Sequence, residues 1–443
     1  MLTLGSLRAR MLRSRGFLGE GWGRGLATTC NGSAVTDGGT GLGTRSGDPS
    51  ARSAYVHLPF CKRKCFYCDF PVVALGKAAS AESPPPAYEN YVNLLSREVR
   101  SYASQAEGAP LETVFFGGGT PSLIPPPQLE RILTCLDSVF GLAPNAEISM
   151  ECDPGTFDQR KLQEFADLGV NRVSLGVQSF DSKLLEACGR SHTLAEVYKA
   201  IEDVHGVTGL RSWSLDLMHG LPHQTPEVWE ATLEETLRAM PPHVSCYDLQ
   251  VEENTPFDRW YQVGNKPLPD EDEGALLFAM ASDRLGGSGY DHYEICSFAK
   301  GSEHRCVHNL GYWRNDAFYG FGLGATSKVH GRRLARPRKM KAYEDWVERG
   351  AEEGEGSHGE IQGQEKEEED LLDSIMLSLR LSSGLDLLSL DAEIASKVVA
   401  AVKDHAKEGL VVLDDKSLRL KDPEGYLLSN TIISDIFAAL DAY

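Results

Sequence analysis

The sequence lacks a long apolar run and has few basic residues relative to acidic ones. Each deficit excludes a class of protein. A membrane-spanning helix needs about 20 consecutive apolar residues. No such run is present, so we expect no integral membrane segment, which leaves a peripheral membrane contact open. The 44 lysines and arginines are outnumbered by 64 aspartates and glutamates, for a formal net charge of −20. Because nucleic-acid binding depends on basic surface, this balance argues against a nucleic-acid partner.

The N-terminal segment, in contrast to the whole chain, has almost no acidic residues. Its first thirty residues contain only Glu20 as an acid, among arginines interspersed with leucine, methionine and phenylalanine. Arginine-rich, acid-poor leaders are typical of organelle presequences. Residues 31–50 are rich in glycine, serine and threonine and predict a flexible spacer. We therefore expect a presequence and spacer over 1–50, with a mitochondrial location favoured over a plastid. A merely disordered tail would leave the protein cytoplasmic.

Three of the ten cysteines are grouped closely. Cys61, Cys65 and Cys68 form a C-x3-C-x2-C pattern just after a strand-like run at 54–58. Three thiolates can hold three irons of a [4Fe–4S] cube and leave the fourth iron open to a small molecule. The basic residues at 62–64 are expected to lower the thiol pKa values and favour thiolates. Such a cluster needs reduced cysteines, as in an intracellular compartment.

A zinc site is the main alternative for these cysteines, with His57 or Asp69 as the fourth ligand. Zinc motifs usually bring a second Cys/His pair at its own spacing. The next cysteine along the chain, Cys135, stands alone. The pattern therefore favours an iron–sulfur cluster over zinc.

Strand-like and helix-like segments alternate between residues 54 and 250, which predicts βα units and a parallel sheet. Six units fall short of the eight of a complete barrel. We therefore expect an α/β fold with a partial (β/α)6 barrel over 51–250. The expected strands are Tyr55–Leu58, Thr113–Phe116, Glu147–Glu151, Arg172–Val177, Trp213–Met218 and Val244–Leu249.

The rest of the chain is expected to form a C-terminal α+β domain. Residues 251–370 read as an extension that ends in an acidic linker. Residues 371–443 begin with an amphipathic helix and continue with a strand, a turn, a strand and a last helix to about 440. This order predicts a small winged-helix-like module. Its acidic residues outnumber its basic ones, so we expect packing rather than DNA binding.

Polar residues follow several of the expected strands, where a parallel βα barrel gathers its chemistry. The second strand runs into Gly117–Thr120, whose glycines would let backbone approach a ligand. No Gly-Lys-Ser/Thr follows, so this turn is not a P-loop. Arg190 can pair with a carboxylate in bidentate fashion. The remaining candidates are Glu151 at the third strand end, Gln178 at the fourth, and Asp216 within the fifth.

These motifs together resemble the HemW branch of the oxygen-independent coproporphyrinogen III oxidase family, within the radical S-adenosylmethionine (SAM) superfamily. The resemblance covers about 54–440. It implies a [4Fe–4S] cluster on the three cysteines and SAM at the open iron. Tyr55, Gly118 and Glu151 match positions that hold the cluster-bound SAM. Positions lining a second SAM in the oxidases are matched by Tyr67, Gly119, Thr120, Gln178, Arg190 and Asp216.

Two departures from the oxidases bear on function. The oxidases have a fourth cysteine where this chain has Phe70, and their extra N-terminal segment is replaced here by the presequence and spacer. The resemblance therefore implies a haem chaperone that delivers haem to client haem proteins. The alternatives are an oxygen-independent coproporphyrinogen III oxidase of porphyrin biosynthesis and a radical SAM enzyme on another substrate. A homodimer is left open.

A haem site can be sought in the stretch Cys306–Trp313. His308 is a candidate axial ligand, and Tyr312 and Trp313 could stack on the macrocycle if the patch is exposed. The alternative is a buried packing corner in which His308 is hydrogen-bonded, since aromatic clusters are often core. Cys306 is the rival ligand, through its thiolate.

Overall fold

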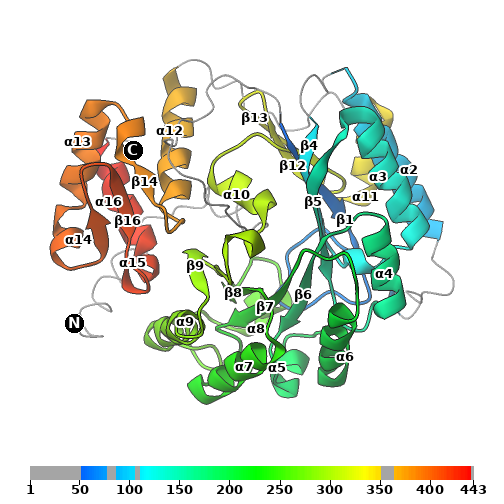
Figure 1. Ribbon diagram of the computed structural model, residues 1–443, viewed down its shortest axis with the longest axis horizontal. Helices are drawn as coiled ribbons and strands as arrows, with labels where there is room; N and C mark the ends of the chain where they lie inside the picture. Colours follow the sequence, from blue (N-terminus) through cyan, green and yellow to red (C-terminus); the bar gives the residue numbers. More distant parts are fainter. Residues whose placement is uncertain (1–50, 77–85, 105–109, 351–363, 441–443) are drawn as a thin grey trace.

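The computed structural model describes residues 51–76, 86–104, 110–350 and 364–440. The expected presequence and spacer at 1–50 lie outside this part of the chain. A nine-stranded sheet in the order β11-β1-β4-β5-β6-β7-β8-β10-β9 forms the larger body, and a smaller module lies beside it (Figure 1).

Six neighbouring strands of this sheet run parallel and correspond to the six expected ones. They are β1 (Ser53–Leu58), β4 (Leu111–Gly118), β5 (Leu142–Cys152), β6 (Arg172–Gln178), β7 (Ser212–His219) and β8 (His243–Asp248). Helices of the βα units cover the outer face, so the partial barrel is confirmed (Figure 1). These helices are α2 (Pro86–Ser101), α3 (Pro126–Phe140), α4 (Gln159–Asp167), α5 (Ser182–Ala187), α6 (Leu194–His205) and α7 (Pro226–Ala239).

Local sequence signals explain where the helices begin. Thr193 caps α6 and Asp270 caps α9 (Glu271–Gly286), each with a glutamate three residues later that returns a hydrogen bond to the cap backbone. This reciprocal arrangement satisfies backbone N–H groups that a helix start leaves unpaired. Trp229 on α7 then donates its indole N–H to the carbonyl of Leu277 on α9 at 2.8 Å. A short helix, α8 (Pro256–Trp260), lies between β8 and α9 in the chain.

Three further strands extend the sheet past the parallel six. β11 (Tyr319–Phe321) pairs parallel with β1, while β10 (Ser297–Ala299) pairs antiparallel with β8 and with β9 (Asp291–Glu294). The sheet thus continues across residue 250, where the sequence predicts a domain boundary. The hairpin β12 (Thr326–Val329) and β13 (Arg332–Ala335) and helix α11 (Met340–Glu348) complete this part.

A buried carboxylate fastens these additions to the barrel. Glu98 on α2 forms an ion pair of 2.7 Å with Arg336, and both side chains are essentially unexposed. Its other oxygen accepts hydrogen bonds from the backbone of Gly322 at 2.8 Å and from the hydroxyl of Tyr343 at 2.7 Å. Glu98 therefore joins α2, the turn after β11 and helix α11.

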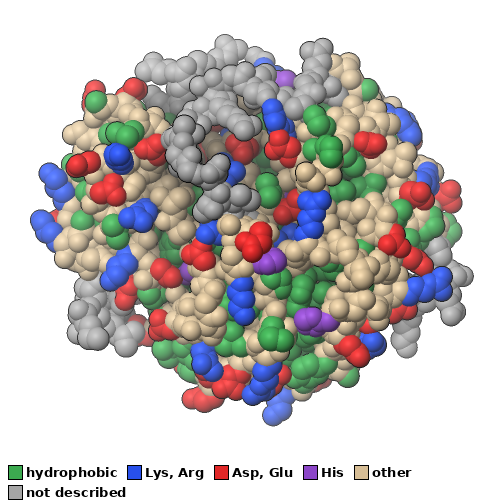
Figure 2. All heavy atoms as spheres, viewed as in Figure 1, with side chains coloured by type: hydrophobic (Ala, Val, Ile, Leu, Met, Phe, Trp, Pro, Cys, Tyr) green, Lys and Arg blue, Asp and Glu red, His purple; other side chains and the backbone are tan. Residues whose placement is uncertain are grey.

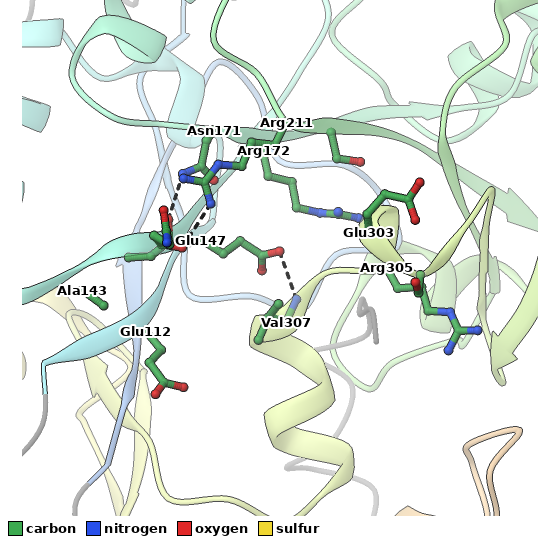
Figure 3. A pocket seen from close by; sticks show the side chains of 13 residues that line it. Glu112, Ala143, Glu147, Asn171, Arg172, Arg211, Glu303, Arg305 and Val307 are labelled. Carbon is green, nitrogen blue, oxygen red and sulfur yellow. Dashed lines mark hydrogen bonds between the residues drawn. The ribbon is translucent and has the colours of Figure 1, made fainter. Parts of the chain in front are cut away.

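The segment from η3 (Ser302–His304) to α10 (Val307–Trp313) closes the N-terminal end of the barrel. Glu147 of β5 accepts hydrogen bonds of 3.0 Å from the backbone N–H groups of Val307 and His308. Figure 3 shows Glu147 reaching the start of α10 beside a cavity of about 360 Å³. Arg172 at the start of β6 donates to the carbonyl of His304 at 2.8 Å. This end is opposite to the one where the strands finish.

The C-terminal module has its own apolar core. It consists of α12 (Gln364–Ser378), β14 (Leu385–Asp386), η4 (Leu387–Ser389), α13 (Ala392–Ala401), α14 (Lys403–Lys407), β15 (Val411–Leu413), β16 (Ser417–Leu420), α15 (Glu424–Leu427) and α16 (Ser429–Ala439). The expected strand, turn, strand and final helix are confirmed, and β14 adds a third strand in the order β14-β16-β15. Asp422 contacts the barrel side through Ser282 and His292, each at 2.8 Å. The winged-helix-like description stays a prediction.

The visible face of the molecule carries acidic and basic side chains interspersed over both bodies (Figure 2). Within the described ranges, no helix combines the length and the apolar character that crossing a membrane requires.

Candidate functional site

The three grouped cysteines lie at the end of the barrel where the parallel strands finish. Cys61 ends β2 (Phe60–Cys61), which pairs with β3 (Val73–Ala74), so the loop between them is closed at its base. Cys61, Cys65 and Cys68 form no disulfide. Burial, with a smaller contribution from the nearby Cys65 thiol, raises the pKa of Cys61 to about 11 and that of Cys68 to about 12. The thiols are therefore close enough to interact electrostatically.

The three basic residues between the cysteines donate hydrogen bonds to backbone carbonyls. Lys62 donates to the carbonyl of Gly155 at 2.5 Å, and Lys64 donates to that of Phe70 at 3.0 Å. Arg63 donates to the carbonyl of Gly189 at 2.9 Å. Burial raises the pKa of Cys61 and of Cys68 and outweighs these charges, although Lys64 lowers the pKa of Cys68 in the predicted direction.

The environment of the loop fits an iron–sulfur cube better than zinc. Both ring nitrogens of His57 are engaged, by Tyr55 and by the carbonyl of Pro71, each at 3.1 Å. Asp69 pairs with Arg338 at 3.1 Å. In the described part of the chain, no three His, Cys, Asp or Glu side chains are placed to hold one metal ion.

The glycines after β4 are required by packing against the end of β1. A Cβ atom on Gly118 would lie 2.5 Å from the His57 ring, and one on Gly119 would lie 2.7 Å from the carbonyl carbon of Pro59. The backbone N–H groups of Gly119 and Thr120 donate to carbonyls of Leu58 and Phe60, each at 2.8 Å. The sequence predicted glycines for approach to a ligand, and the structure adds this second reason.

Two carboxylates interact near this end: Glu151 on β5 and Asp216 on β7, the strands on either side of β6. Glu151 accepts from the backbone N–H of Gly118 at 3.0 Å. Burial and then the neighbouring Asp216 raise the pKa of Glu151 to about 7, against the opposing effect of that N–H group. Asp216 accepts from Ser174 at 2.5 Å and from Ser214 at 3.2 Å, and burial raises its pKa as well. The sequence did not single out these serines.

Arg190 is the most heavily bonded side chain of the site. One terminal nitrogen forms an ion pair with Asp153 and donates to the carbonyl of Gly176 at 2.7 Å. The other donates to the Tyr67 hydroxyl at 3.2 Å and to Cys65 Sγ at 3.5 Å. The ring of Tyr67 packs near that of Phe257, with the ring centroids 6.1 Å apart.

Asp153 is a functional candidate that the sequence motifs did not single out. It also accepts from Ser191 and from His192, each at 3.1 Å. Burial would raise its pKa, but Arg190 and His192 outweigh burial and lower it. The signal in the sequence is an aspartate directly after a strand end, combined with Gly189–His192 downstream.

Buried polar atoms without a protein partner at this end include Oε1 of Gln178, Nε of Arg190 and Nε2 of His192. The backbone of Gln178 also has a φ of 67°, which is uncommon for a residue other than glycine. Buried polar groups are nearly always hydrogen-bonded in proteins. The unpaired atoms therefore indicate where a polar ligand such as SAM would find partners. Bound here, a cluster and SAM would supply one-electron cleavage of the sulfonium.

His308 lies at the opposite end of the barrel. Its ring is 1% exposed, and its two nitrogens contact Thr113 Oγ1 at 2.7 Å and the Tyr312 hydroxyl at 2.9 Å. Thr113 precedes Gly118 by five residues of β4, roughly 16 Å of strand. Trp313 is also buried. The prediction of an exposed patch is wrong, and the alternative of a packed corner is what the structure contains.

The cysteine nearest to that corner is equally enclosed. Cys306 is fully buried, and burial raises its pKa. Its thiol contacts Ser149 at 3.9 Å, within a small cluster that includes Tyr55 and Phe115. Most site residues therefore lie either at the C-terminal strand ends or around α10 at the opposite end, and Tyr55 lies between them, packed with Cys306 and bonded to His57.

The chain is similar to known proteins over most of its length. The Radical SAM superfamily profile matches residues 55–236. The chain is 40% identical over 408 residues to "Heme chaperone HemW" of Synechocystis, covering 88% of this chain and 97% of that protein. It is 28% identical to "Radical S-adenosyl methionine domain-containing protein 1, mitochondrial" of Danio rerio, covering 88% of each.

A solved structure supports the fold over the same length. The coproporphyrinogen III oxidase HemN of Escherichia coli superposes with a TM-score of 0.72 at 21% identity, covering 88% of this chain and 91% of that one. At this identity the likeness establishes architecture alone. The match to a HemW protein at 40% identity, over 97% of that protein's length, establishes the family. The chain belongs to the HemW family of radical SAM proteins.

Proposed function

We propose that this protein is a haem chaperone: it binds haem, carries a [4Fe–4S] cluster and SAM, and passes haem to client haem proteins. The observation that carries the proposal is the 40% identity to a protein named as a heme chaperone, over 97% of that protein's length. The relation is continuous across the barrel and most of the remaining chain, so it is more than a shared superfamily core.

The cluster and SAM are assigned to the C-terminal strand ends. Cys61, Cys65 and Cys68 would bind the three irons. Tyr55, Gly118 and Glu151 would hold the cluster-bound SAM. Glu151 is a carboxylate whose raised pKa would fall once a cationic ammonium group lies beside it. A second SAM would be lined by Tyr67, Gly119, Thr120, Gln178, Arg190 and Asp216; the unpaired oxygen of Gln178 supports a polar ligand there.

The second candidate function is oxygen-independent oxidation of coproporphyrinogen III, and the shared architecture with HemN favours it. Phe70 argues against it. The oxidases have a cysteine at that position, whereas here the Phe70 backbone serves as an acceptor for Lys64 within the loop. A side chain without a thiol cannot take over the role of that cysteine.

Haem ligation by His308 requires one of its hydrogen bonds to break. Both ring nitrogens are hydrogen-bonded and the ring stacks on Phe115 at 5.2 Å, so an axial bond requires the contact with Tyr312 or Thr113 to break. We keep His308 as a proposed ligand of a rearranged state, with Tyr312 and Trp313 lining the haem. The described histidines with exposed side chains, His205, His223 and His330, are the alternatives.

We further propose that the protein acts in mitochondria. The support is the arginine-rich leader together with a relative that is named as mitochondrial. The clients would then be respiratory or other haem proteins of that organelle. A fusion of residues 1–50 to a fluorescent protein should enter mitochondria. Fluorescence in plastids or in the cytoplasm would contradict the mitochondrial location.

One anaerobic comparison separates chaperone from oxidase. The reconstituted full-length protein is incubated with haem, and separately with coproporphyrinogen III, SAM and a reductant. We expect haem binding near one equivalent and no protoporphyrinogen above a control without cluster. Product formation in the second reaction would establish the oxidase instead.

A further inference from the structure

The cysteine loop and the segment Cys188–Arg190 hold each other by hydrogen bonds in both directions. From the loop, the backbone N–H of Phe66 donates to the carbonyl of Cys188 at 3.0 Å, and Arg63 donates to that of Gly189 at 2.9 Å. In return, Arg190 donates to Tyr67 and Cys65 of the loop. The position of the guanidinium relative to Cys65 is thus fixed from both sides.

The Arg190 guanidinium is also held on the side away from Cys65. Its other terminal nitrogen bonds Asp153 and the carbonyl of Gly176, and the side chains of Arg190 and Asp153 are only 10% and 15% exposed. Ser191 and His192 bind the same carboxylate. Moving the guanidinium away from Cys65 would leave a nearly buried carboxylate without its charge partner, which is costly.

A donor fixed in this way acts on the sulfur once Cys65 is a thiolate. A hydrogen bond from a guanidinium to an anionic acceptor is charge-assisted and stronger than a neutral one. Hydrogen bonds to the sulfurs and local charge are among the factors that set the reduction potential of an iron–sulfur cluster. The reduced cluster carries more negative charge than the oxidised one, so a cation beside its ligand stabilises the reduced form.

We infer that Arg190, held by Asp153, raises the reduction potential of the cluster through its hydrogen bond to Cys65 Sγ. Arg190 is in this respect a positioning and tuning residue, in addition to any contact with SAM. The two terminal nitrogens are already occupied, and only Nε, buried and unpaired, is left to donate elsewhere. The inference rests on the proposed cluster site and is independent of haem delivery.

The test is a potentiometric titration of the anaerobically reconstituted full-length protein without SAM, followed by electron paramagnetic resonance of the reduced cluster. The variants are Arg190→Gln and Arg190→Lys, and iron and sulfide are measured first. The matched control is Arg338→Gln, which removes an arginine that binds Asp69 beside the same loop rather than a cysteine. In Arg190→Gln alone, the nearly buried Asp153 carboxylate would lose its charge partner. The double variant Arg190→Gln/Asp153→Asn removes both charges of the pair together.

We expect Arg190→Gln to keep the cluster and to reduce about tenfold less readily, equivalent to about 59 mV for a one-electron couple. Arg190→Lys, which keeps the charge, should lie between this variant and wild type, and Arg338→Gln should lie near wild type. If Arg190→Gln misfolds, the double variant must show the lower potential. Unchanged potentials in variants that retain iron would overturn the inference. Wild-type protein without a cluster would contradict the cluster site itself.

Discussion

Glu151 accepts a hydrogen bond from the backbone N–H of Gly118 at 3.0 Å, which joins the C-terminal ends of two neighbouring strands. Burial at this position removes water from the carboxylate and disfavours its charged form, so the pKa of Glu151 rises to about 7. A folded-state pKa above the ordinary value of 4.5 means that the folded protein retains a proton that the unfolded chain has lost. The stability of the protein without cofactors should therefore fall as pH rises from about 4.5 through about 7.

Glu151→Gln should remove this part of the pH dependence. Between pH 6 and pH 8, wild type should lose about 1 kcal/mol more of its unfolding free energy than the variant, on the scale of 1.36 kcal/mol per pKa unit. The measurement is denaturant unfolding of cluster-free protein at both pH values. Equal losses in the two proteins would show that Glu151 is ionised across this range.

The cluster should depend on the three grouped cysteines alone. Replacing Cys61, Cys65 and Cys68 by alanine should abolish bound iron and sulfide after anaerobic reconstitution, because no other described cysteines share their spacing. Cys306→Ala is the matched control, since that thiol lies buried at the other end of the barrel and should leave iron content unchanged. Full iron occupancy in the triple variant would refute the assignment.

The buried ion pair between Glu98 and Arg336 should matter far more for stability than an exposed one. Glu98→Gln leaves a buried guanidinium uncompensated, which typically costs about 3–5 kcal/mol. Glu112→Gln breaks the pair with Arg52, in which the side chains are 31% and 50% exposed, and should cost less than about 1 kcal/mol. Thermal unfolding of both variants checks the contrast, which similar melting temperatures would contradict.

The hydrogen bond between Tyr312 and His308 gives a specific test of the haem ligand. If Nε2 of His308 binds iron, Tyr312→Phe frees that nitrogen and should speed haem binding, while His308→Ala should shift or weaken the Soret band. The cluster absorbance should persist in both, because α10 lies at the other end of the barrel. An unchanged Soret band in His308→Ala would place the ligand elsewhere, and His223→Ala and Cys306→Ser would be examined next.

The sequence was sufficient for the regular part of the fold. Strands such as Arg172–Gln178 are apolar runs that alternate with amphipathic helices, and this local pattern is preserved in the structure. The loop Cys61–Cys68 could be singled out because its three cysteines lie close together in the sequence. Strands β9 to β11 could not be placed, since short runs such as Tyr319–Phe321 acquire their partner only through pairing with distant β1.

Burial was the quantity that the sequence could not supply. Thiol pKa values were expected to follow the adjacent basic residues, but burial of Cys61 and Cys68 outweighs those charges. His308 and Trp313 look like a ligand and a stacking face in sequence. The enclosure of His308 depends on Glu147 and Thr113 of two strands more than 150 residues away, and Trp313 packs with Tyr293 and Leu377. The role of Asp153 likewise depends on the distant Arg190.

Haem transfer is the measurement that tests the central claim most directly. Haem-loaded full-length protein is mixed with an apo-haem protein in excess, and the spectrum of the acceptor is followed alongside free haem at the same concentration. We expect the acceptor to gain its holo spectrum at a rate that depends on the concentration of this protein, with no SAM consumed in proportion. Failure to bind haem, or transfer no faster than dissociation into solution, would contradict the chaperone proposal.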